Sequence, residues 1–237
     1  MNKLQFTFEK KTFRVTLVDQ ASRSVWSEIF KLREYKVAEE IIRTNKDPII
    51  DVGAHVGLFS LYCRVFNTTV PIYALEPEAE NFELLNQHIR ENNLTKIKTF
   101  KSALSYQSGT AELFVSDDSH NHYLSRIPTD ISKETDTHKP AQIVQTFSLR
   151  DFLNQEKILR VGLLKMDIEG GEYDVFESCN ADDFARVRFI IMEYHNYEGQ
   201  HYSQIENLLR SNGFGVQIFP SKFDKRMGFL FANNKRI

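Results

Sequence analysis

The chain contains 237 residues, of which 41% are hydrophobic and 26% are charged, and its formal net charge is -2. Nucleic-acid and membrane surfaces usually need a basic excess, so this balance argues against both as partners. No apolar run is long enough to span a bilayer. The two cysteines, Cys63 and Cys179, have neither metal-site spacing nor the density of a disulfide scaffold, so we expect reduced thiols in a cytoplasmic protein.

The first 45 residues differ in pattern from the remainder. Apolar and polar residues alternate over residues 4–18, which predicts a β-hairpin. Residues 24–43 carry apolar side chains at helical spacing, with Ser24 as the expected N-cap, which predicts one helix. We therefore expect a hairpin-helix extension over residues 1–45 and a larger domain over residues 46–237.

Strand-like and helix-like runs alternate from residue 46 onward. Strands are predicted at residues 48–53, 70–77 and 96–104, with amphipathic helices between them. This βαβαβ order implies a parallel sheet with helices on both faces. Further strands are predicted at residues 109–116, 160–170, 187–195, 214–220 and 227–234. The last two are close enough in sequence to form an antiparallel pair.

A polar stretch at residues 116–142 interrupts this alternation. It has little periodicity and is too long for a passive connection between two elements. We interpret it as a lid over the functional site, with Asn121 and His122 as candidate substrate contacts. The histidines in this stretch do not have zinc-site spacing.

The loop after the first of these strands has the sequence DVGAHVG. A dinucleotide site needs G-x-G-x-x-G, whereas Gly53 and Gly57 are four residues apart, and Asp51 would repel a pyrophosphate. A P-loop needs G-K-[ST], which is absent. S-adenosylmethionine fits better, because it is cationic and Glu76, at the end of the next strand, could bind its ribose hydroxyls. Alternatively, the glycines only permit a tight turn and Glu76 only favours the start of a helix.

Several segments together resemble the FkbM family of methyltransferases over residues 47–197. They are DVGAHVGLFS, YALEPEAENFELLNQHI, KSALS, LLKMDIEGGEYDVF and IMEYH. The string K-x-D-x-E-G-x-E, from Lys165 to Glu172, is the most distinctive. The resemblance implies an α/β, Rossmann-like class I methyltransferase fold, with a mostly parallel seven-stranded sheet and an antiparallel last strand. It also implies S-adenosylmethionine as cofactor and, most often, a hydroxyl of a sugar or secondary metabolite as methyl acceptor.

The resemblance assigns a set of positions to the cofactor. They are Asp51, Gly53, His55, Gly57, Ser60, Glu76, Pro77, Ser102, Ala103 and Asp167. Asp51, Gly53 and Gly57 would lie along the methionine portion, and Glu76 would hold the ribose. Ser102 and Ala103 would be near the adenine, and Asp167 near the methionine amino group or the transferred methyl. The family usually has asparagine at the position of His55.

Acidic residues and a histidine follow two later strands. These strands are expected to flank the first one, which would bring their terminal side chains to one cleft. His195 is the preferred general base, because a neutral imidazole is available near neutral pH, and Glu169 is the second candidate. Glu193 could orient His195 or bind an acceptor hydroxyl. The remaining candidates are Lys165, to steady the acidic cluster, and Glu172, as a substrate contact or a helix-start residue.

A divalent metal held by Asp167, Glu193 and His195 is a rival mechanism that the spacing alone does not favour. The leading prediction is an O-methyltransferase acting on a small-molecule or glycan acceptor. Methyl transfer to nitrogen or carbon, including in a protein, and a non-catalytic binding module remain alternatives. The N-terminal extension could cover the cleft, with Tyr35 or Trp26 reaching the cofactor, or it could mediate a homodimer.

Overall fold

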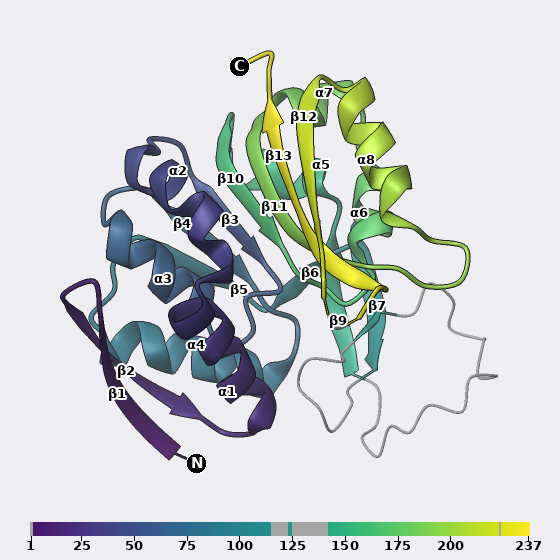
Figure 1. The fold of residues 1–237 in the computed structure, drawn as a ribbon. Coiled ribbons are helices and arrows are strands. Elements are labelled where there is room, and N and C mark those ends of the chain that lie inside the picture. The colour runs from purple at the N-terminus through teal and green to yellow at the C-terminus, as the bar shows by residue number, and fades with distance from the viewer. Residues whose placement is uncertain (1, 115–122, 125–141, 223) are drawn as a thin grey trace.

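The computed structural model describes residues 2–114, 123–124, 142–222 and 224–237, and these form an α/β fold around one large sheet (Figure 1). The strands of this sheet are β3 (Ile49–Val52), β4 (Ile72–Leu75), β5 (Ile97–Phe100), β10 (Val161–Met166), β11 (Val187–His195), β12 (Phe214–Pro220) and β13 (Met227–Asn234). Their order is β12-β13-β11-β10-β3-β4-β5. The pairs from β5 to β11 are parallel, and β13 runs antiparallel to both β11 and β12. The predicted class of sheet is therefore confirmed.

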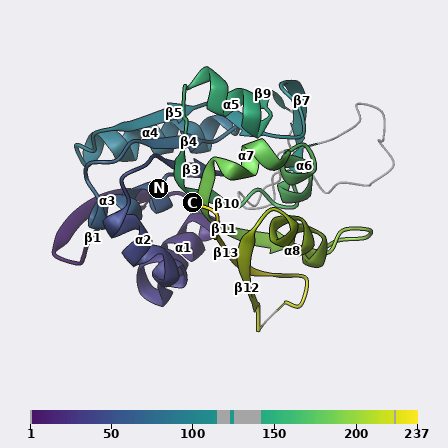
Figure 2. The same ribbon diagram turned by 90° about the horizontal axis from the view of Figure 1, so that it is seen from above.

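Helices cover both faces of this sheet, and each face has its own apolar core (Figure 2). One face carries α3 (Leu58–Phe66), α4 (Ala79–Glu91) and the N-terminal elements. The other carries α5 (Leu149–Gln155), α6 (Glu172–Glu177), α7 (Ala181–Ala185) and α8 (Tyr202–Ser211). Every residue of β3 and β10 is buried, as expected for central parallel strands covered on both sides. No helix among the described residues is long and apolar enough to cross a membrane.

The N-terminal extension begins with the predicted hairpin, β1 (Asn2–Phe8) and β2 (Lys11–Leu17). The single helix predicted for residues 24–43 is wrong. Four short segments replace it: α1 (Gln20–Trp26), the π-helix η1 (Ser27–Leu32), the 3₁₀ helix η2 (Glu34–Ala38) and α2 (Glu39–Thr44). Asp19, rather than Ser24, is the N-cap of α1.

The break in this helical region occurs at Arg33, which has a left-handed backbone with φ 56°. That conformation costs a non-glycine residue about 1 kcal/mol. The Arg33 guanidinium is held by Glu39, with Nη2 2.7 Å from both carboxylate oxygens. Glu39 in turn accepts a hydrogen bond of 2.6 Å from the Tyr62 hydroxyl on α3. The break therefore depends on side chains that come later in the sequence.

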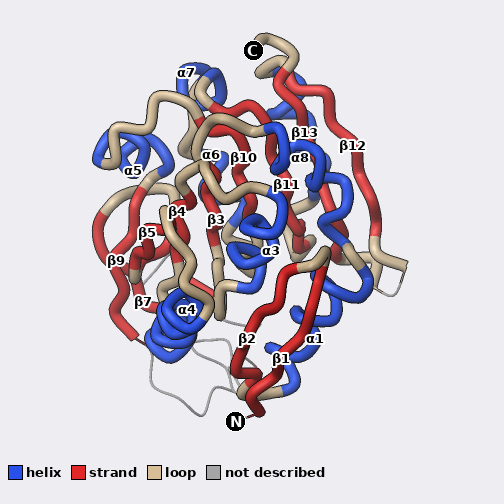
Figure 3. Tube along the Cα trace, turned by 90° about the vertical axis from the view of Figure 1, so that its left-hand side faces the viewer, coloured by secondary structure: helices blue, strands red, loops and turns tan. Residues whose placement is uncertain are grey.

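His88 of α4 fastens the hairpin to the sheet domain, and the hairpin lies next to α1 (Figure 3). The backbone N–H of Thr16 donates to His88 Nε2 at 2.8 Å, and His88 Nδ1 lies 2.7 Å from the carbonyl oxygen of Val56. The ring is therefore neutral, with its proton on Nδ1, and burial lowers the pKa of His88. One side chain thus links β2, α4 and the glycine-containing loop.

A second, four-stranded sheet stands beside the main one, in the order β6-β9-β7-β8. Its strands are β6 (Ser102–Leu104), β7 (Gly109–Phe114), β8 (Tyr123–Leu124) and β9 (Gln142–Phe147). The strand predicted at residues 96–104 is in fact divided between the two sheets, and β9 was not predicted. Most of the proposed lid, including Asn121 and His122, lies outside the described residues.

Gly53 sits where the strand order reverses, between the ends of β3 and β10. Its φ is +68°, and a Cβ at this position would overlap the backbone carbonyl oxygen of Asp167. Gly57, with φ +84°, ends the same loop, and a Cβ there would press on Leu85 of α4. Glycine is required at both positions because other segments of the protein lie too close to the loop to leave room for a side chain.

We expect Gly53→Ala to lower the free energy of unfolding by ~3 kcal/mol or more, because it combines a left-handed backbone with a steric overlap. Gly199→Ala is the matched control: Gly199 has φ +81°, but nothing lies within 4 Å of a Cβ there. Its expected cost is about 1 kcal/mol. Urea unfolding of both variants measures the difference, and equal costs would contradict the close approach.

Candidate functional site

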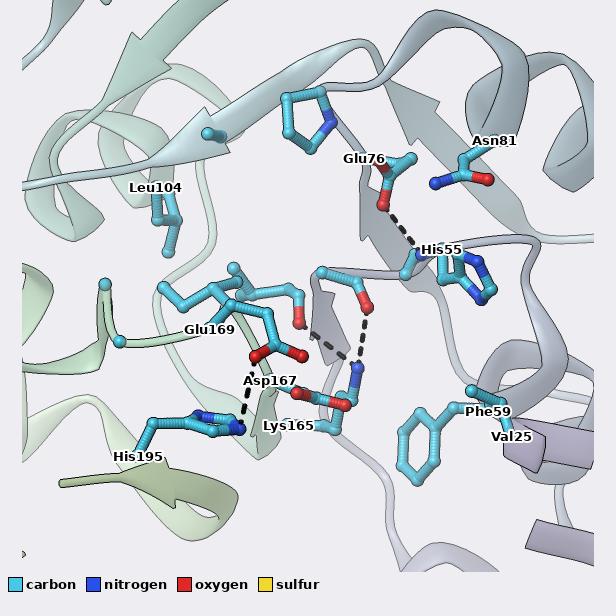
Figure 4. A pocket seen from close by; sticks show the side chains of 18 of the residues that line it. Val25, His55, Phe59, Glu76, Asn81, Leu104, Lys165, Asp167, Glu169 and His195 are labelled. Atoms are coloured by element: carbon cyan, nitrogen blue, oxygen red, sulfur yellow. Dashed lines mark hydrogen bonds and ion pairs between the residues drawn. The ribbon is translucent and has the colours of Figure 1, made fainter. Parts of the chain in front are cut away.

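A pocket of about 600 Å³ opens at the carboxyl ends of β3, β4, β10 and β11 (Figure 4). Only β10 flanks β3 on this side, because β11 lies beyond β10; the expectation that both strands flank β3 is wrong. The pocket nevertheless spans these strand ends. Glu76 and Asn81 lie on one side of it, and Asp167, Glu169 and His195 lie on the other (Figure 4).

A buried lysine fixes the loop that follows β3. Lys165 Nζ donates to the carbonyl oxygens of Gly53 at 2.7 Å and Val52 at 3.3 Å, and lies 3.4 Å from Asp51 Oδ1. The other oxygen of Asp51 accepts a hydrogen bond of 2.8 Å from Ser60 Oγ. The buried Asp51 carboxylate is thus paired with the Lys165 ammonium group and hydrogen-bonded to Ser60, and these contacts help to hold the loop in place.

The sequence-predicted residues of this loop therefore fall into two groups. Gly53 and His55 line the pocket, as does Lys165, whereas Asp51, Gly57 and Ser60 are outside its lining. Asp51 and Ser60 are fully buried on β3 and α3 respectively. Their contribution to this pocket is to hold the loop that lines it.

Glu76 lies directly after β4, with its carboxylate at the pocket wall. Its Oε2 accepts the backbone N–H of His55 at 2.8 Å, and its Oε1 accepts that of Glu78 at 2.9 Å. Burial raises the pKa of Glu76, the two backbone hydrogen bonds oppose this, and the result is about 7. Pro77 and Ala103 line the same wall, while the buried Ser102 does not.

His195 is at the opposite side, between two glutamates. Its Nδ1 is 3.3 Å from Oε1 of Glu172, and its Nε2 is 3.5 Å from Oε2 of Glu169. Glu172 is fully buried outside the pocket lining, and its Oε1 also accepts the backbone N–H of Ile168 at 3.1 Å. Glu172 therefore holds the histidine in place from within the protein.

The charge state of His195 differs from the sequence-based expectation. Burial lowers its pKa, but the hydrogen bond and charge of Glu172, with the charges of Glu169 and Asp167, outweigh burial and raise the pKa to about 10. At neutral pH the ring is then an imidazolium rather than the neutral imidazole that a general base requires. Burial and the neighbouring Asp167 raise the pKa of Glu193 to about 9.

The N-terminal extension contributes one apolar wall of the pocket. Val25, Ile29 and Tyr35 line it together with Phe59 of α3. Tyr35 was one of two aromatic residues expected to reach the site, while Trp26 is not in the lining. The other lining residues that the sequence analysis missed are Val52, Ala54, Leu58, Asn81, Leu104, Ser105, Leu113, Ile168, Gly170, Gly171, Asp174, Asn196 and Tyr197. Many of them directly follow or precede predicted site residues, so extending each motif by one or two positions would have found them.

Comparison with protein families gives one decisive match. The family model described as the methyltransferase FkbM domain matches residues 51–216, which include most of these pocket residues. The chain belongs to the FkbM methyltransferase domain family. It is therefore a methyltransferase by family, as the sequence motifs predicted.

Curated methyltransferases are similar to this chain over most of their length. Methyltransferase sdnD of Sordaria araneosa is 26% identical over 215 residues, covering 81% of this chain and 82% of that protein. Methyltransferase 1 of Beauveria bassiana is 24% identical, covering 72% and 73%. The 31-O-demethyl-FK506 methyltransferase FkbM of Streptomyces tacrolimicus is also 24% identical with the same coverages.

Solved structures agree on the fold of this FkbM-family chain. Magnesium protoporphyrin IX methyltransferase (ChlM) from Synechocystis PCC 6803, with bound SAM, has a TM-score of 0.52 and 11% identity. That match covers 93% of this chain and 86% of the other. The METTL16 MTase domain has a TM-score of 0.51 and 14% identity, covering 86% and 67%. These likenesses show the class I methyltransferase fold.

We expect Glu172→Gln to lower the pKa of His195, because it removes the hydrogen-bonded charge that does most to raise it. NMR titration of the imidazole C–H signals measures the pKa in both proteins. Glu177→Gln, at the far end of α6, is the matched control and should leave the pKa nearly unchanged. A wild-type His195 that loses its proton in the neutral range would contradict the described ion pairs.

Proposed function

We propose that this FkbM-family protein is an S-adenosylmethionine-dependent O-methyltransferase that methylates a hydroxyl of a sugar or secondary metabolite. The observation that carries the proposal is the pocket itself, with a carboxylate that suits a ribose on one side and proton-transfer groups on the other. The name of the Streptomyces tacrolimicus relative, which refers to an O-demethyl compound, supports an oxygen acceptor.

The residues present fit this cofactor. The pocket volume of about 600 Å³ is in the range of small-molecule sites. The Glu76 carboxylate can accept hydrogen bonds from a vicinal diol, while Ala103, Leu104 and Leu113 offer an apolar surface for an adenine ring. Asp167 offers a carboxylate to the cationic end of the molecule. The glycine loop brings bare backbone between these two regions.

S-adenosylmethionine supplies a methyl group bonded to a positively charged sulfur, and the sulfur keeps the electron pair when the carbon–sulfur bond breaks. The chain must then orient the acceptor oxygen and receive its proton. Glu169 is the better proton acceptor in this structure, because His195 already carries a proton. The His195 imidazolium, 3.5 Å from the Glu169 carboxylate, holds that carboxylate at the pocket surface.

Glu76 gives a direct test of cofactor binding. With a pKa of about 7, Glu76 gains its charge as the pH rises, so affinity for S-adenosylmethionine should increase by up to about tenfold from about pH 6 to about pH 8. Isothermal titration calorimetry measures this. The Glu76→Gln variant should bind S-adenosylmethionine more weakly and should not show this increase with pH. It also serves as the control, because titration of the ligand itself changes the affinity of both proteins equally. Absence of saturable binding to the wild type would overturn the proposed function.

Glu169→Gln tests the proton acceptor. We expect kcat to fall by about 10²-fold or more with little change in cofactor affinity, because the substitution keeps the shape but removes the basic oxygen. The assay is transfer of a labelled methyl group to a panel of hydroxylated sugars and small metabolites, with the product linkage determined by NMR. A methylated nitrogen or carbon in the product would replace the O-methyl assignment, and unchanged turnover would exclude Glu169 as the base.

A further inference from the structure

Three side chains converge on one point at the side of the pocket where Glu169 and His195 lie, which is the proposed acceptor side; two of the three, Asp167 and His195, line the pocket. Asp167 follows β10, while Glu193 and His195 are two residues apart on the adjacent β11 and so project to the same face. One potential ligand atom from each lies within 4.8 Å of the other two. Metal–ligand bonds of about 2.0–2.2 Å place ligand atoms about 3–4.4 Å apart, so small side-chain rotations would close the site.

The orientation of His195 matches that of a metal ligand. Metal-bound histidines almost always donate their other ring N–H to a carboxylate or carbonyl group. Here Nδ1 faces Glu172 Oε1 at 3.3 Å, and Glu172 is fully buried and fixed by the backbone N–H of Ile168. Nε2, which faces Glu169 Oε2 at 3.5 Å, is then the ring atom that would bind an ion, and the ion would take the place of its proton because a metal-bound imidazole is neutral.

The surrounding charge also favours a cation. Asp167, Glu169 and Glu193 lie together around His195, and the charge of Asp167 also acts on Glu34. The ammonium group of the nearby Lys165 is committed to the carbonyl oxygens of the glycine loop and to Asp51. Two carboxylates and one imidazole suit a divalent transition metal better than Ca²⁺, which prefers a larger shell of oxygen ligands.

We propose that Asp167, Glu193 and His195 bind a divalent transition-metal ion, such as Mn²⁺, at the acceptor side of the pocket. Glu172 orients the histidine, and Glu169 stands beside the site. Binding of the ion is independent of the proposed function, whereas its role rests on it: the ion would hold the acceptor oxygen and favour its ionised form.

The first test is a titration of the full chain with Mn²⁺ in the absence of methyl donor and acceptor, in which the EPR signal of the free ion measures how much Mn²⁺ is bound. We expect one saturable site. Glu193→Gln should weaken it by ~100-fold, and Glu172→Gln by about 10–100-fold through loss of histidine orientation. Glu34→Gln is the matched control, because it removes a neighbouring carboxylate charge without removing a ligand, and it should change affinity only a few fold.

The second test identifies the ligand atom in the wild-type protein, so it does not depend on a variant folding. Pulsed EPR of bound Mn²⁺ should show coupling to one ¹⁴N nucleus, and His195→Gln should abolish it. Absence of saturable binding, or of nitrogen coupling, overturns the proposal. Calorimetry with S-adenosylmethionine on the same samples separates the two ideas: cofactor binding without Mn²⁺ binding refutes the metal site alone, and the reverse refutes the proposed function alone.

Discussion

One buried ammonium group joins the two strand ends on which the pocket depends. Lys165 belongs to β10, yet its hydrogen bonds go to the backbone at the end of β3 and its ion pair to Asp51. Its side chain is only 4% exposed, so the charge is stabilised by these contacts rather than by water. Removing one partner of such a pair leaves an uncompensated charge, which costs about 3–5 kcal/mol. This side chain therefore ties the start of the glycine loop to β10, the strand after which Asp167 and Glu169 follow.

The two sides of the pocket are built on different principles. The side proposed to bind the methyl donor, here called the donor side, uses backbone groups of the glycine loop and a single carboxylate, Glu76, whose position is fixed by two backbone N–H groups. The acceptor side uses titratable side chains, and their charges depend on one another: Glu172 and Glu169 keep His195 protonated. Ligand recognition on the donor side therefore depends on shape and hydrogen bonds. Chemistry on the acceptor side depends on which group holds a proton or a cation.

Local patterns were sufficient to predict much of this molecule. The strand periods, the family motifs and the acids after β4 and β10 follow from neighbouring residues, and they located the sheet and the pocket. Features that depend on distant contacts were missed: the break at Arg33 needs Glu39 and Tyr62, and β9 is defined by pairing with β6 and β7. The charge of His195 was also mispredicted, because it is set by a glutamate buried at the start of another helix.

The origin of the apolar wall has a consequence for how this protein could be modified. Val25, Ile29 and Tyr35 precede residues 51–216, the part of the chain that matches the family model. They belong to short helical segments whose path is set by Arg33 and Glu39, and none of them takes part in the Lys165 network. The shape of this apolar wall can therefore be redesigned by editing one contiguous stretch of about 20 residues. The donor side would keep its own supports during such a redesign.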